Sequence, residues 1–347
     1  MKMNINYYLC FLVLFAMSCS GNFSDKKVIG SVDELKNAEL YFTEMPVETF
    51  LGNPYQLEFV DNQLIIADDV DGKAILLYDL ANDTFARSLA IGQGPNDVST
   101  PIEISVARES GSVFILQRQN GICREYQLSD LLQSPVVSNN AVNLSRSDRF
   151  VKTHDGYIGS GFYEGGMIQM YSNKGEQLKN IDIYPLYKLE NASEKYKIFQ
   201  GHLCFNERMN RLVIAPYFTC SINFYTANGV DLTKVNSFSI GDKVIEKRIE
   251  EDKNNLDILQ EDIIHCTDIC SSNHYFYILY SGATMENVNN ASNKYILRFD
   301  LLGELDDVYK VDSQIRNICV SADDEIIYAL LLNKNLDYVV AKAILNE

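Results

Sequence analysis

A short apolar segment recurs six times along the chain, and this repetition constrains the fold more than any other feature of the sequence. The copies start at residues 64, 113, 157, 212, 275 and 326, so successive starts lie 44 to 63 residues apart. Most copies are followed by a strand-like run with an aromatic residue and polar turn residues, as in "LLYDL" and "LRFDL". A third run precedes each copy, as in "YQLEFV" and "IEISVA", and a fourth follows most of them. The repeating unit is therefore a four-stranded antiparallel meander.

Six such meanders predict a closed ring. One meander cannot bury both of its faces, whereas radial packing lets each unit cover its neighbours and leaves only short edges. The spacing is that of propeller blades with two insertions, at 186–200 and 242–262, and the second insertion has the apolar spacing of a short helix. We therefore predict an all-β, six-bladed β-propeller of four-stranded blades over residues 39–347. The sixth unit ends after three strands, so "AELYFTEM" near residue 40 is expected to complete it and close the ring.

The N-terminus is predicted to direct export. Residues 1–18 contain a lysine and an apolar run of roughly a dozen residues, which is too short to span a bilayer and typical of a signal peptide. The run ends at "AMSC", which resembles a bacterial lipobox with Cys19 as the lipidated residue; the alternative is an ordinary signal with an incidental cysteine. Residues 19–38 are then the lipidated cysteine and a polar tether. The prediction is a lipid-anchored protein of the cell envelope, at the outer membrane, with the periplasmic side and the surface both left open.

Charge and cysteine content restrict partners and chemistry further. The net charge of −17 repels phosphate backbones, so no nucleic acid partner is expected, and the membrane is contacted through the lipid anchor only. An exported protein can form disulfides, but the sequence does not define a pairing. Buried free thiols are the default expectation for the six remaining cysteines, which are Cys123, Cys204, Cys220, Cys266, Cys270 and Cys319.

The stretch "IGQGPND" after the first meander resembles the start of a phosphate-binding loop, but its residues do not fit one. Asp97 stands where a dinucleotide loop needs its third glycine, and no Lys-Ser/Thr pair follows for a Walker A loop. We interpret the stretch as a structural turn in which Gly92 and Gly94 adopt backbone angles that other residues avoid. Gln93 and Asn96 of this turn remain candidate rim residues for ligand binding.

Candidate ligand-binding side chains also lie in the strands predicted to be innermost, which line the central channel of a propeller. These candidates are Glu58, Glu103, His202, His265 and Asp268. No HxH or HExxH spacing occurs, so we expect no metal and no cofactor, and no catalytic residue is assigned.

The lipobox, the six meanders and the Gly-x-Gly-Pro-Asn stretch at residues 92–96 together resemble the TolB-like six-bladed β-propeller lipoproteins of Gram-negative gut anaerobes. The resemblance implies a fold and a cellular location, but it does not imply a catalysed reaction. We predict a membrane-anchored binding or scaffold module whose partner is an envelope protein or a small molecule such as a glycan fragment. The alternative is a metal-dependent hydrolase or lyase with its site at the channel mouth, so catalysis remains an open question at this stage.

Overall fold

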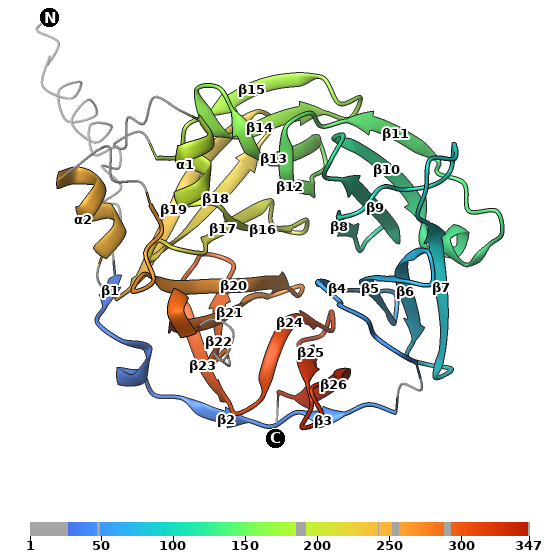
Figure 1. The fold of residues 1–347 in the computed structure, drawn as a ribbon. Helices are drawn as coiled ribbons and strands as arrows, with labels where there is room; N and C mark the ends of the chain where they lie inside the picture. The colour runs from blue at the N-terminus through green and yellow to red at the C-terminus, as the bar shows by residue number, and fades with distance from the viewer. Residues whose placement is uncertain are drawn as a thin grey trace, which may run out of the picture.

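The computed structural model of the protein describes residues 27–46, 49–184, 192–241, 243–251, 257–287 and 293–345. Within these residues the chain forms six mainly antiparallel sheets, arranged as blades around a common centre (Figure 1). The predicted all-β, six-bladed propeller is therefore confirmed. The predicted signal peptide and the lipidated Cys19 lie outside the described residues.

Each blade starts with an innermost strand at the channel and proceeds outward in sequence order. The strands of blades 1 to 3 are β4 (Gln56–Val60), β5 (Gln63–Val70), β6 (Lys73–Asp79) and β7 (Thr84–Ala90); β8 (Ile102–Ala107), β9 (Ser112–Gln117), β10 (Ile122–Gln127) and β11 (Asn140–Asn143); and β12 (Ser147–Lys152), β13 (Gly156–Tyr163), β14 (Gly166–Ser172) and β15 (Gln177–Ile181). The strands of blades 4 to 6 are β16 (Gly201–Asn206), β17 (Arg211–Pro216), β18 (Ser221–Asn228) and β19 (Asp231–Ile240); β20 (Ile263–Ser271), β21 (Tyr275–Thr284), β22 (Tyr295–Asp300) and β23 (Leu305–Val311); and β24 (Gln314–Val320), β25 (Ile326–Leu332) and β26 (Tyr338–Ile344).

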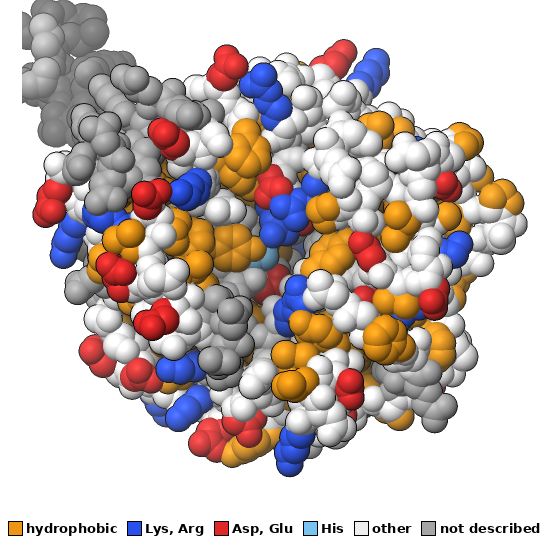
Figure 2. Space-filling model, viewed as in Figure 1, with side chains coloured by type: hydrophobic (Ala, Val, Ile, Leu, Met, Phe, Trp, Pro, Cys, Tyr) orange, Lys and Arg blue, Asp and Glu red, His pale blue; other side chains and the backbone are white. Residues whose placement is uncertain are grey.

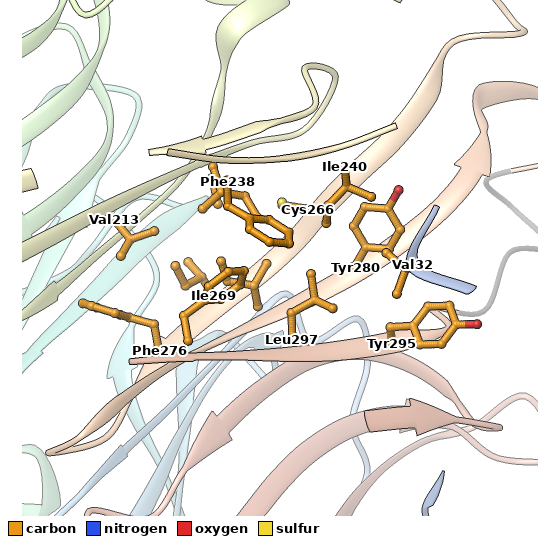
Figure 3. Packing of buried hydrophobic residues seen from close by; sticks show 14 of the residues in the cluster. Val32, Val213, Phe238, Ile240, Cys266, Ile269, Phe276, Tyr280, Tyr295 and Leu297 are labelled. Carbon is orange, nitrogen blue, oxygen red and sulfur yellow. The ribbon is translucent and has the colours of Figure 1, made fainter. Parts of the chain in front are cut away.

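The second strand of each blade is a nearly continuous apolar run because both faces of the blade are covered by neighbouring blades. In β5, for example, all four residues from Leu64 to Ala67 are completely buried. Figure 3 shows the cluster of apolar side chains between blades 4 and 5, to which Phe238, Phe276 and Leu297 contribute. The core of the protein is therefore a set of clusters between blades, and removing one blade would expose both of its neighbours.

The N-terminal segment closes the ring and extends further than the sequence predicted. β3 (Thr43–Glu44) pairs antiparallel with β26 and completes blade 6, which confirms the predicted closing strand. Before that, β1 (Lys27–Ile29) and β2 (Ala38–Leu40) add parallel to the outermost strands of blades 4 and 5. In the described part of the chain, the first paired strand is β1, within the stretch predicted as a tether. A 3₁₀ turn at Val32–Glu34 joins the first two strands, and the buried Val32 side chain packs into the cluster between blades 4 and 5 (Figures 1 and 3).

Both insertions contain a helix. α2 (Val244–Glu251) confirms the helix predicted in the second insertion and buries Ile245 and Ile249. α1 (Ala192–Phe199) in the first insertion was not predicted. Side chains of the two helices share one apolar cluster, which also contains Met167 of blade 3, so the insertions cover one rim together (Figure 1). None of the helices in the described ranges is long and apolar enough to cross a membrane.

The turn between blades 1 and 2 keeps its glycines for a different reason from the predicted one. Neither Gly92 nor Gly94 has a left-handed φ, so the prediction of unusual backbone angles is wrong. Instead, the Asp97 carboxylate folds back and accepts a hydrogen bond from the Gly94 amide at 2.8 Å. A Cβ at Gly92 or Gly94 would come within 2.7 Å of a carboxylate oxygen of Asp97. The glycines therefore leave room for this carboxylate.

Candidate functional site

The innermost strands of the six blades surround a polar cavity of about 100 Å³ along the channel. On the face of the molecule in Figure 2, a histidine side chain is visible near the centre, beside acidic and basic side chains. A single water occupies roughly 10–15 Å³ by this measure, so the cavity has room for a small molecule or one compact end group of a larger one.

Four of the predicted site residues line this cavity. Glu58 comes from β4, Glu103 from β8, His202 from β16 and Asp268 from β20. The sequence separates these residues by up to 210 positions, and the ring brings them together because each belongs to an innermost strand.

Three other predicted residues do not reach the cavity. His265 is 4 % exposed and its ring lies against Tyr280, with 5.9 Å between the ring centroids, so its assignment to the channel is wrong. His265 and Asp268 are three residues apart on β20, but the register of β20 against β21 shifts on both sides of Cys266, so simple alternation does not assign their faces. Gln93 and Asn96 lie on the outer turn after β7 and are not part of the cavity wall.

Sequence reasoning missed the cations of the channel. Arg149 on β12 forms an ion pair with Glu103, with 2.5 Å between Nη1 and Oε2, and also donates a hydrogen bond to the Tyr217 hydroxyl at 3.0 Å. Arg108, directly after β8, lies over the Phe59 ring at 5.9 Å. Both arginines belong to or adjoin innermost strands, and this position is the sequence signal that could have identified them.

Asp268 has the most elaborate surroundings in the cavity. Its Oδ2 accepts hydrogen bonds from the Ile318 amide at 2.8 Å and from Asn317 Nδ2 at 3.3 Å, and its Oδ1 lies 3.8 Å from His202 Nδ1. Burial raises the pKa of Asp268 to about 7, although these hydrogen bonds oppose the shift. Burial also lowers the pKa of His202 well below its ordinary value, and the charge of Arg149 lowers it further, so the imidazole is neutral near pH 7.

Glu58 has no cationic partner within hydrogen-bond distance among the described residues. Its Oε1 accepts a hydrogen bond from Gln56 Nε2 at 3.2 Å. Burial raises the pKa of Glu58 to about 8, while the charge of Arg108 lowers it and the charge of Asp268 raises it. Glu58 and Asp268 are therefore two carboxyl groups that share one desolvated space and hold protons near neutral pH.

Three side chains of the cavity wall carry buried polar atoms without a hydrogen-bond partner among the described residues. These atoms are Nη1 of Arg108, Nε2 of His202 and Oδ1 of Asn317. Native proteins satisfy nearly all buried polar groups, and an unsatisfied one costs about 1–3 kcal/mol. All three residues belong to the wall of one cavity, so the unsatisfied polar groups cluster around it.

Metal binding has no such support in the described part of the chain. No three His, Cys, Asp or Glu side chains there lie close enough together to hold a metal ion. All six cysteines after the N-terminal segment are free thiols, and Cys204 is the one that is not fully buried.

A closed six-bladed ring with a charged, partly unsatisfied channel defines the class of this protein as a β-propeller with its candidate site at the hub. The chain belongs to the TolB-like 6-blade propeller-like family, whose model matches residues 33–323. No curated protein is similar enough to match the chain.

Solved structures share the fold at low sequence identity. A putative exported protein from Bacteroides fragilis NCTC 9343 aligns with a TM-score of 0.60 and 10 % identity, covering 92 % of this chain and 98 % of its own. A member of the DUF4221 family from Bacteroides vulgatus ATCC 8482 aligns with a TM-score of 0.56 and 12 % identity, covering 89 % of this chain and 98 % of its own. At these identities the likeness extends to the fold alone.

Proposed function

We propose that this protein is a binding module of the cell envelope that takes a small polar ligand into its central channel. The observation that carries the proposal is the convergence of three unpartnered buried atoms, on Arg108, His202 and Asn317, at one cavity. A ligand that bonds to these atoms removes their desolvation cost, and this gain adds to the affinity.

The size of the cavity favours a small molecule over a protein partner at this site. About 100 Å³ admits a compact polar group, such as the end of a glycan fragment, but no folded element of a partner. A protein partner would have to bind on the rim instead. The metal-dependent hydrolase or lyase considered as an alternative needs a cluster of metal-ligating side chains, and the described residues supply none.

The envelope location rests on the N-terminal sequence. The signal-like run followed by Cys19 motivates it, and the similar Bacteroides fragilis protein carries the description "exported". In a Gram-negative host, the wild-type chain should fractionate with the outer membrane and incorporate labelled palmitate. Cys19→Ala should abolish both the label and the membrane association; a variant that stays lipidated would contradict the assignment.

Ligand binding can be tested by thermal unfolding of the purified full-length lipoprotein against a panel of small sugars, carboxylates and amines. We expect at least one of these classes to raise the unfolding midpoint of the wild type but not of the variant that removes its contact. That variant is Arg108→Met, which removes the guanidinium lying over the Phe59 ring, for a neutral or anionic compound, and Asn317→Ala for a cationic one. The matched control is Arg146→Met, because the Arg146 side chain is 56 % exposed on the surface. Should Arg108→Met fail to fold, Asn317→Ala removes a second unpartnered atom.

Two results would contradict the proposal. One is that no compound changes the wild-type midpoint, and the other is that Arg108→Met and Asn317→Ala respond as the wild type does. An envelope protein that binds wild type and Arg108→Met equally, with no response to small molecules, would instead indicate a scaffold that works through its rim.

A further inference from the structure

We propose that the group entering the channel carries a single positive charge, as a protonated amine does, and that Glu58, Asp268 and Asn317 bind it. This inference rests on the proposed function and specifies the class of ligand for the same cavity.

The charges in the cavity wall do not balance. Five carboxyl groups and four basic groups line the cavity, which leaves one negative charge in excess when all are ionised and histidine is neutral. One ion pair lies within the wall, between Glu103 Oε2 and Arg149 Nη1 at 2.5 Å. Buried charges in proteins are paired, so a wall with one surplus carboxylate favours a ligand with one positive charge.

The charge of Asp268 acts on Glu58, so these two carboxyl groups are near enough to each other for one cation to interact with both. Neither forms an ion pair with an arginine or lysine within 4 Å in the described part of the chain, and Arg108 is the basic group whose charge acts on Glu58 most strongly. A guanidinium therefore acts on each carboxyl group only at longer range, Arg108 on Glu58 and Arg149 on Asp268. The remaining negative charge lies between β4 and β20.

The free hydrogen-bonding atoms next to these carboxylates are acceptors. Among the described residues, Oδ1 of Asn317 has no hydrogen-bond partner, and Nδ2 of Asn317 donates to Asp268. The side chain of Asn317 belongs to a residue only 5 % exposed, so this oxygen has no ready access to bulk water. An ammonium group has three donors and no acceptor, which matches one carbonyl oxygen and two carboxylates.

Proton release is the expected signature of this binding. The groups that face Glu58 are Gln56 on its own strand, Glu103 and Arg108 on the side of blade 2, and Asp268 across the channel. The groups that face Asp268 are His202 of blade 4, Asn317 and the Ile318 amide of blade 6, and Arg149 of blade 3. Without a cation the two carboxyls hold protons near neutral pH, and a bound ammonium group would displace about one of them. Affinity should therefore rise between pH 6 and pH 8.5.

Three probes of equal size separate the charge classes. Ethanolamine, ethylene glycol and glycolate carry charges of +1, 0 and −1 near neutral pH, and sodium chloride at the same concentration controls for ionic strength. At about 50 mM and pH 8.5, we expect ethanolamine alone to raise the unfolding midpoint of the full-length protein, by roughly 2 °C or more. Calorimetry at pH 7, where the two carboxyls still hold protons, should show the release of about one proton in buffers of different ionisation enthalpy.

Variants then assign the binding to the proposed residues. Glu58→Gln and Asp268→Asn should each weaken ethanolamine binding about tenfold or more and reduce the proton release, whereas Glu261→Gln, at an exposed position, should behave as the wild type. An equal or larger response to ethylene glycol, glycolate or sodium chloride would overturn the inference, as would no response to ethanolamine up to about 100 mM. A neutral or anionic ligand that depends on Arg108 would leave the proposed function intact while this inference fails; no ligand of any class would end both.

Discussion

Replacement of Glu58 by glutamine should make the stability of the protein less dependent on pH. The pKa of Glu58 is raised from 4.5 to about 8 in the folded protein, mainly by burial. The folded state therefore binds more protons at this residue than the unfolded chain does between these two values. Stability is fully present below the unfolded pKa and is lost progressively as the pH rises through the folded pKa.

The size of this effect follows from the shift. At about 1.4 kcal/mol for each pKa unit, ionisation of Glu58 costs the folded state about 4 kcal/mol between pH 5 and pH 9. Glutamine has the same shape and no charge, so Glu58→Gln should match the wild type at pH 5 and exceed its stability by up to about 4 kcal/mol at pH 9. Asp268, with a pKa raised to about 7, should leave the variant with a smaller loss of stability over the same range.

Urea denaturation followed by circular dichroism at pH 5, 7 and 9 measures this difference. The control is Glu261→Gln, which removes a carboxylate from an exposed position and should parallel the wild type at every pH. A constant difference in unfolding free energy between Glu58→Gln and the wild type across this range would refute the reasoning. Such a result would mean that the Glu58 carboxyl is hydrated in the folded protein and ionises as it does in the unfolded chain.

Two further predictions concern the frame that holds the channel. Gly303→Ala should lower the unfolding free energy, measured in urea titrations, by about 2 kcal/mol more than Gly229→Ala does. Both glycines have a left-handed φ, but a Cβ at Gly303 would lie 2.5 Å from the Phe224 ring, whereas a Cβ at Gly229 would meet nothing within 4 Å. Equal losses of unfolding free energy in the two variants would contradict this packing. Thr43→Cys combined with Lys342→Cys should form a disulfide between β3 and β26, because these two residues are paired in blade 6. The disulfide should raise the unfolding free energy by about 2–4 kcal/mol relative to the same variant after reduction. If peptide mapping finds no disulfide under oxidising conditions, the pairing register of β3 with β26 is wrong.

The ring could be predicted from the sequence because the strand pattern that produces each blade is local and is repeated along the chain. Each blade needs a strand pattern within a single window of roughly 50 residues, and the six windows each contain one. The incomplete last unit also predicted its partner, since a three-stranded blade at the end of a chain leaves an open edge and "AELYFTEM" was the strand-like segment left over. The addition of β1 and β2 to blades 4 and 5 had no comparable signal, because those two blades already have four strands and three-residue parallel pairs leave little trace in a sequence.

The candidate site was predictable only in outline. Innermost strands could be recognised, and with them Glu58, Glu103, His202 and Asp268. The error at His265 arose because membership of an innermost strand does not define which face a side chain takes, and the β20–β21 register shifts on both sides of Cys266.

The sequence by itself determined that six similar sheets must pack radially, because each sheet has two apolar faces to cover and no other element in the chain can cover them. It also determined which strands line the channel. Only the tertiary structure decided which polar side chains contact one another there. Glu103 binds Arg149, 46 residues away in the sequence, and Asp268 binds Asn317, 49 residues away. These contacts depend on how neighbouring blades are placed against each other. That placement is set by packing over the whole interface between the blades, so the sequence around either residue alone does not predict it. The same packing buries Asp268 and partly buries Glu58 at the cavity, and this burial turns two ordinary acidic residues into a candidate binding site.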